Sequence, residues 1–181
     1  MPTPSERSRQ ASSRELSGPN RGGIERDAGG GLAVPPSYGA AAIAACAVFV
    51  LYVATLLPST AMWDTSEYLT AAKVLGIPHP PGNPFFVLLG HVFALLPIAP
   101  TVAQRVNLMA ALTSALSASI WFLVTERVLA HWLPARWQRL TGAAMTVIIG
   151  STAFTVWSQS IVNEKVYTVA LLFLAIVTWL V

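Results

Sequence analysis

Charged residues are scarce in this sequence. Lys, Arg, Asp and Glu together make up 10% of its 181 residues, whereas hydrophobic residues make up 54%. An average soluble domain has about a quarter charged residues. The apolar residues also form long blocks instead of one face of a helix or strand, which excludes an ordinary soluble fold and indicates helices surrounded by lipid.

Cysteine is almost absent, since Cys46 is the only one. A disulfide framework is therefore excluded. No Cys or acid stands at metal-ligand spacing around His79 or His91, so we expect no structural zinc site. We predict no metal ligand and no cofactor, and the sequence does not determine whether a divalent metal is needed. The net charge of +3 does not indicate nucleic acid, because the Arg residues of the first 37 positions alternate with acids in a tail rich in Pro, Ser and Gly.

The long apolar blocks predict an all-α, polytopic bundle of transmembrane helices. A span needs about 20 apolar residues to cross a hydrocarbon core of about 30 Å. The predicted organisation is a disordered cytoplasmic tail at 1–37, spans at 38–57, 106–125, 140–156 and 166–181, and an outer loop at 58–103. The outer loop contains two short stretches with helical character, which we expect to lie at the membrane surface.

Lys and Arg in short loops set the orientation of such a bundle. The tail and the loop after the second span hold most of the Arg residues, so both are predicted to be cytoplasmic. The outer loop and the turn at Glu164 then share the extracytoplasmic face. The last predicted span reaches Val181, the final residue, and we expect the chain to be the N-terminal portion of a longer protein.

The outer loop contains two acids, Asp64 and Glu67, which lie three residues apart and so share one face of a helix. One interpretation is catalytic, with a base and a supporting hydrogen-bonding group. The other is a capping box, with Asp64 at the N-cap and Glu67 at the third helical position, followed by a stop at Gly76. The spacing is the same in both interpretations.

Other polar residues border this loop. His79 stands in a rigid Pro- and Gly-rich turn, where it is either a structural corner or a hydrogen-bonding group for a phosphate or an acceptor. Arg105 and Asn107 open the second span; Arg105 is either a cation at the membrane boundary or a receptor for a lipid phosphate. Glu164 is either the partner of the neighbouring Lys165 or a second acid of the outer site.

Several motifs occur in the same order as in a known family. They are Trp63-Asp64-Thr65-Ser66-Glu67-Tyr68, Leu75-Gly76-Ile77-Pro78-His79-Pro80-Pro81-Gly82-Asn83-Pro84, Arg105-Val106-Asn107-Leu108, Trp157-Ser158-Gln159 and the run from Glu164 to Tyr167. In this series, from about residue 40 to the end, the chain resembles a family of polytopic membrane proteins related to protein O-mannosyltransferases. It departs from the family pattern at Asn83, where Tyr is more frequent, and at Lys165, which is inserted in an acid-Val-Tyr run.

The resemblance implies the GT-C architecture, in which a first outer loop carries an acidic motif and surface helices. It also implies inverting transfer of a sugar from a polyprenyl-phosphate donor to a protein or glycan acceptor. Carried over to this chain, Asp64 would be the general base and Glu67 would support it. Our own substrate-binding candidates, chosen from the residues themselves, are His79, Arg105, Asn107 and Glu164, with Arg105 for the donor phosphate. We expect a multi-pass protein of a bacterial inner membrane, with no nucleic-acid partner.

Two other functions compete with the glycosyltransferase. A transporter would use charged groups inside its spans, whereas the acids singled out above lie in loops. A non-catalytic membrane scaffold would tolerate replacement of both Asp64 and Glu67.

Overall fold

The computed structural model describes residues 25–26, 32–33, 35–61 and 64–181. Contacts divide the chain into two units, Met1–Pro35 and Pro36–Val181. In the first unit, β1 (Glu25–Arg26) pairs antiparallel with β2 (Leu32–Ala33). This pair was not predicted, since two-residue strands are too short to leave a periodic signal. Most of the predicted disordered tail, 1–37, lies outside the described residues.

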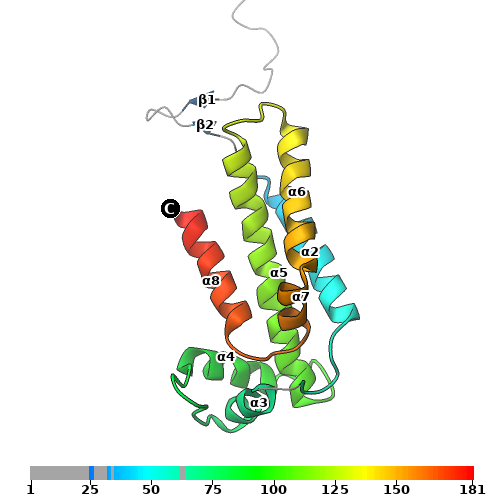
Figure 1. Ribbon diagram of the computed structural model, residues 1–181, viewed down its shortest axis with the longest axis vertical. Coiled ribbons are helices and arrows are strands. Elements are labelled where there is room, and N and C mark those ends of the chain that lie inside the picture. The colour runs from blue at the N-terminus through cyan, green and yellow to red at the C-terminus, as the bar shows by residue number, and fades with distance from the viewer. Residues whose placement is uncertain (1–24, 27–31, 34, 62–63) are drawn as a thin grey trace, which may run out of the picture. The chain divides into compact units, whose positions relative to one another are not determined.

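The second unit is helical, as predicted (Figure 1). Its helices are α2 (Tyr38–Ala54), α3 (Thr65–Val74), α4 (Pro84–Leu95), α5 (Val102–Leu129), α6 (Arg136–Thr152), α7 (Phe154–Ile161) and α8 (Tyr167–Leu180). Each predicted span overlaps a helix, and the two short helices expected in the outer loop are α3 and α4.

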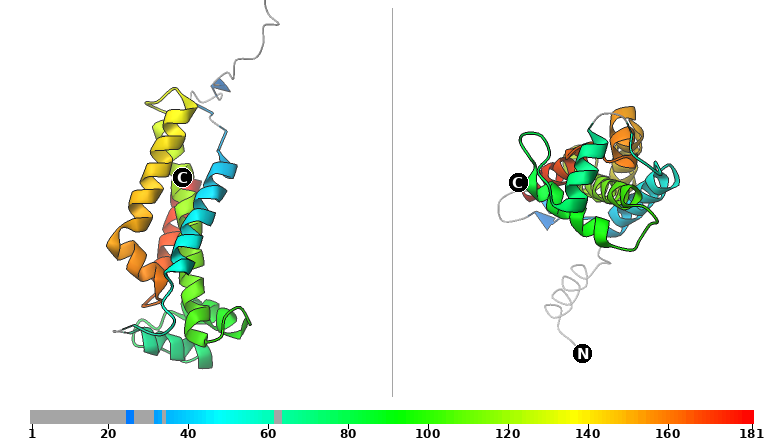
Figure 2. Two further views of the ribbon diagram at one scale, coloured as in Figure 1. Left: turned by 90° about the vertical axis from the view of Figure 1, so that its right-hand side faces the viewer. Right: turned by 90° about the horizontal axis from the view of Figure 1, so that it is seen from below.

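α5 is the central helix and packs against α2, α6 and α8 (Figures 1 and 2). Small residues line these contacts: Ala111 and Ala143 are fully buried beside the larger Tyr52 and Phe122. Side chains of this size let helix backbones approach closely, which favours helix association in lipid.

Among the described residues, α5 alone is a single helix long and apolar enough to cross a membrane. The pair α6 and α7 meets the same test if it is counted as one span bent by 66°. α2 and α8, with 17 and 14 residues, are apolar but shorter, and at 1.5 Å per residue they reach only about 26 and 21 Å. Soluble proteins can also contain one or two such helices, so the polytopic architecture stays a prediction.

The third predicted span, 140–156, is interrupted. The helix breaks at Ala153, whose ψ of 130° is not helical, and resumes as α7. Neither Pro nor Gly stands at the break. Polar contacts to α2 flank it instead: Tyr52 donates to the Ser151 carbonyl at 2.9 Å, and the Trp157 ring nitrogen donates to Thr55 at 3.1 Å.

α3 and α4 form a second core at the end of the bundle where α5 begins (Figure 1). Tyr68 and Phe86 are buried there, with their rings edge to face, and they share the cluster with Val106 and Val169. The predicted rigid turn is present, with Gly82 at φ 78° in the left-handed region. This core fixes the outer-loop helices against the start of α5 and α8.

Candidate functional site

Asp64 precedes the first turn of α3, where the sequence suggested a capping box. Its side chain makes no capping hydrogen bond. The carboxylate instead lies 2.8 Å from the ammonium of Lys165, in the turn before α8. The capping interpretation is therefore wrong for Asp64. The sequence also suggested Glu164 as the partner of Lys165, and the partner in the structure is Asp64.

Glu67 and His79 are joined by two contacts. The Glu67 carboxylate accepts a hydrogen bond from the His79 backbone N–H at 2.6 Å and lies 2.9 Å from the ring Nδ1. The other ring nitrogen of His79 lies 3.9 Å from Asp64. The structure thus brings together three residues predicted from the sequence, Asp64, Glu67 and His79, and adds Lys165. We call these four residues the acid cluster.

The protonation of the acid cluster follows from these contacts. The hydrogen bond from Lys165 lowers the pKa of Asp64, and the hydrogen bonds from His79 lower the pKa of Glu67. The hydrogen bond to Asp64 raises the pKa of Lys165. Both carboxylates and the ammonium are therefore charged at neutral pH.

The acid cluster also has donor atoms for a cation. One ligand atom each from Asp64, Glu67 and His79 lies within 4.8 Å of the others. Carboxylate oxygens are the ligands that Mg²⁺ and Ca²⁺ prefer. Lys165 already neutralises Asp64 in this arrangement, so a metal ion would compete with the ammonium, and the predicted absence of a metal stays a prediction.

The side chains of Arg105 and Asn107 both bond to backbone groups of neighbouring segments. The Arg105 guanidinium donates to the carbonyls of Ala99 at 2.7 Å and Ala94 at 2.9 Å. These bonds tie the end of α4 to the start of α5. The side chain of Arg105 thus has two partners within the fold.

Asn107 is fully buried. Its amide donates to the carbonyls of Leu57 and Ser59 at 3.0 and 3.2 Å, and its oxygen accepts from the Asn163 backbone N–H at 2.9 Å. One side chain thus connects the loop after α2 to the turn that carries Lys165.

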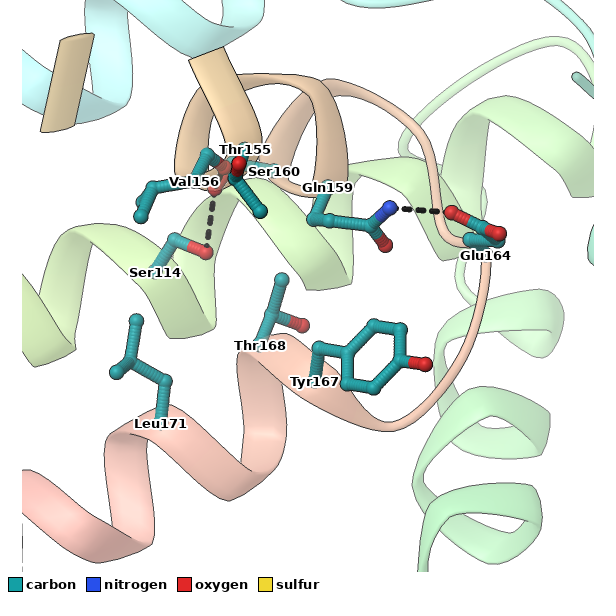
Figure 3. Close-up of a pocket in the computed structure, with 9 residues that line it drawn as sticks. All are labelled: Ser114, Thr155, Val156, Gln159, Ser160, Glu164, Tyr167, Thr168 and Leu171. Atoms are coloured by element: carbon teal, nitrogen blue, oxygen red, sulfur yellow. Dashed lines mark hydrogen bonds between the residues drawn. The ribbon is translucent and has the colours of Figure 1, made fainter. Parts of the chain in front are cut away.

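The Glu164 carboxylate has a partner outside the acid cluster: it accepts a hydrogen bond from the Gln159 amide. The side chains of Gln159 and Glu164 line a cavity of about 470 Å³ between α5, α7 and α8 (Figure 3). Sequence reasoning did not select Lys165 or the cavity residues of α7 and α8 as site residues. The insertion of Lys165 in the family run was the one signal that could have found it.

Residues 64–181 match the family model described as the protein O-mannosyl-transferase TMEM260 N-terminal domain. A mouse protein O-mannosyl-transferase TMEM260 is 42% identical over 82 residues, 45% of this chain and 11% of that protein. A Dictyostelium discoideum protein of the same name is 31% identical over 98 residues, 53% of this chain and 12% of that protein. The aligned part of the chain is thus a small share of these relatives' lengths. No solved structure matches the chain.

The family match contains the whole acid cluster, because it begins at Asp64 and continues beyond Lys165. It also bears out the resemblance to protein O-mannosyltransferases. Both relatives come from eukaryotes, so they give no support to the predicted bacterial inner membrane.

Proposed function

The chain belongs to the family of protein O-mannosyl-transferase TMEM260 N-terminal domains, and from this premise we propose that it forms the N-terminal part of a membrane mannosyltransferase. The enzyme would transfer mannose from a polyprenyl-phosphate donor to a hydroxyl group of a protein on the extracytoplasmic face. α2, α5, the α6–α7 pair and α8 would lie in the bilayer, and α3 and α4 would lie at its outer surface.

The proposed reaction is a direct displacement. The acceptor oxygen forms a bond to the anomeric carbon of mannose while the bond from that carbon to the phosphate oxygen breaks. The lipid phosphate leaves with the electron pair, and the acceptor proton passes to Asp64. Such a step needs a base beside the acceptor and a positive charge for the leaving phosphate.

The observation that carries this proposal is the Asp64–Lys165 pair, which places a base and a cation 2.8 Å apart. A carboxylate whose pKa is lowered by an ammonium is a weak proton acceptor. We therefore propose that the donor phosphate draws Lys165 away from Asp64. Donor binding would then raise the basicity of Asp64 at the moment when the base is needed.

Lys165 fits the donor phosphate better than Arg105 does in this fold. The Arg105 guanidinium already donates to two backbone carbonyls, and moving it would leave both without partners. Glu67 and His79 would hold the turn beside Asp64. Asn107 would position the turn of Lys165.

The proposal is tested by transfer of labelled mannose into protein in membranes that contain the full-length parent. Polyprenyl-phosphate mannose should serve as donor, and a nucleotide-linked mannose added alone should not. Lys165→Gln should raise the KM for the lipid donor about tenfold or more, as expected for loss of a charged contact worth at least about 1.4 kcal/mol.

Lys73→Gln is the matched control, because Lys73 is an exposed lysine on the last turn of α3. It should leave the KM unchanged. If the correctly folded protein transfers no sugar from any lipid-linked donor, the proposed glycosyltransferase function is contradicted and a non-catalytic membrane scaffold is favoured.

A further inference from the structure

The cavity between α5, α7 and α8, here called the outer cavity, has several polar groups in a largely apolar lining. Figure 3 shows the hydroxyl groups of Ser114, Ser160 and Thr168 and the hydrogen-bonded side chains of Gln159 and Glu164 around it. Its volume of about 470 Å³ is within the usual range for small-molecule sites, about 300 to 1,000 Å³.

Thr168 lines the outer cavity and has a side-chain hydroxyl group that makes no hydrogen bond within the part of the fold that the structure describes. Its residue is 4% exposed, and its hydroxyl has no hydrogen-bond partner in the described structure. The hydroxyl points into the outer cavity (Figure 3). Buried hydroxyl groups are nearly always paired, so the unpaired one indicates a ligand with hydrogen-bonding groups.

The charge of the lining limits the kind of ligand. Among the residues that the structure describes, no Lys, Arg or His lines the outer cavity, and the one carboxylate in its lining is that of Glu164. An anion such as a phosphate would therefore meet a carboxylate without a compensating side-chain cation. Hydroxyl and amide groups suit a neutral ligand with several hydroxyls, and the ring of Tyr167 offers an apolar face beside them.

A second cavity adjoins the first. It has a volume of about 250 Å³ and shares Ser114, Val156 and Leu171 with the outer cavity. Its other lining includes the apolar side chains of Trp121 and Val147, inside the bundle. We call it the inner cavity. An apolar chain attached to a polar head group would fit the pair, with the head group outside and the chain within.

We propose that the two cavities together bind an amphipathic lipid whose head group is neutral and polyhydroxylated, such as a sugar joined directly to an alkyl chain. This site differs from the acid cluster, and its ligand lacks the phosphate of the proposed donor. The proposal does not depend on transferase activity.

Photo-crosslinking with the full chain in phosphatidylcholine nanodiscs tests this site. The probe is an alkyl glucoside that carries a diazirine in its chain, and the labelled residues are identified by mass spectrometry. We expect labelling of the helix segments around the inner cavity. An excess of unmodified alkyl glucoside should reduce this labelling at least tenfold, whereas an alkyl alcohol of the same length should not.

Thr168→Val removes the unpaired hydroxyl and keeps the side-chain shape. It should weaken competition by the glucoside about three- to tenfold, as expected for one hydrogen bond. Thr178→Val is the matched control on α8, because the Thr178 hydroxyl bonds the carbonyl of Leu174 in its own helix and is exposed. It should bind like the wild type.

Three results would overturn the proposal. Equal competition by the alcohol would reduce the site to a groove for apolar chains. Stronger competition by an alkyl phosphate would show that the site binds anions. The alkyl phosphate is tested because no side chain caps the start of α8, whose free N–H groups could bind an anion. A Thr168→Val chain that melts below the wild type would show that the hydroxyl is already satisfied in the free protein.

Discussion

Asp64 occupies a position where a carboxylate ordinarily accepts a hydrogen bond from the first turn of its own helix. Here it contacts Lys165 across the fold, and the first turn of α3 has no side-chain cap. The chain thus gives up a local stabilising interaction of about 1 kcal/mol. The side chain of Asp64 stays 33% exposed in this contact, so a substrate can reach it.

The Asp64–Lys165 pair predicts how stability depends on pH. The pKa of Asp64 is lowered and that of Lys165 is raised in the fold. The Asp64 contribution is present above its unfolded pKa and is lost as the pH falls through the folded pKa. The Lys165 contribution is present below its unfolded pKa and is lost as the pH rises through the folded pKa.

We therefore expect the wild type to have a higher melting temperature than Lys165→Met throughout the neutral pH range. The difference should shrink as the pH is taken below 3.8, the ordinary carboxyl value, or above 10.5, the ordinary lysine value. Thermal unfolding in detergent across this range measures it. A difference that does not shrink at either end of this range would contradict the assignment of the effect to the Asp64–Lys165 pair.

The sequence and the structure agree on some residues of the site and differ on others. Asp64, Glu67 and His79 were found from the sequence because they lie in one short loop with recognisable local patterns. Lys165 was missed, since its contact with Asp64 joins segments far apart in the chain and depends on how the turn before α8 meets the start of α3. The pairing of Asn107 with the turn at Asn163 was missed for the same reason.

At the scale of elements, Asn107 joins three segments: α5, the loop after α2 and the turn before α8. Asn107→Ala would leave up to three backbone groups without partners, one of them the N–H of the buried Asn163. We expect it to lower the free energy of unfolding by about 3 kcal/mol. Denaturant or thermal unfolding of the purified chain measures the change, and a loss below about 0.5 kcal/mol would show that water replaces the amide.

Helix boundaries show which local signals are reliable. The long apolar blocks located the helices of the bundle, because these helices are apolar on their exposed faces as well as on their packed faces. The break at Ala153 carries no Pro or Gly, and its flanking contacts from Tyr52 and Trp157 come from tertiary structure. The end of α3 also differs by one residue from the expected stop at Gly76, since the left-handed position is Leu75.

At the scale of the whole molecule, the proposed orientation places α3, α4 and the acid cluster on the extracytoplasmic side. Two single-cysteine chains test it in a Cys46→Ala background. Ile77 is 92% exposed between α3 and α4, and Trp132 is 71% exposed between α5 and α6. Ile77→Cys should react with a membrane-impermeant maleimide on intact cells, and Trp132→Cys should react only after lysis. The reverse pattern would contradict the orientation.

The central claim is that Asp64 is the base for sugar transfer, and the direct test is a comparison of wild type with Asp64→Asn in the full-length parent. The rate of labelled mannose transfer from polyprenyl-phosphate mannose should fall at least a hundredfold, as expected for loss of a general base. Protein level should change little, and the melting temperature should fall about as far as in Lys165→Met, because both variants lose the same ion pair. Transfer at the wild-type rate by Asp64→Asn would contradict the account.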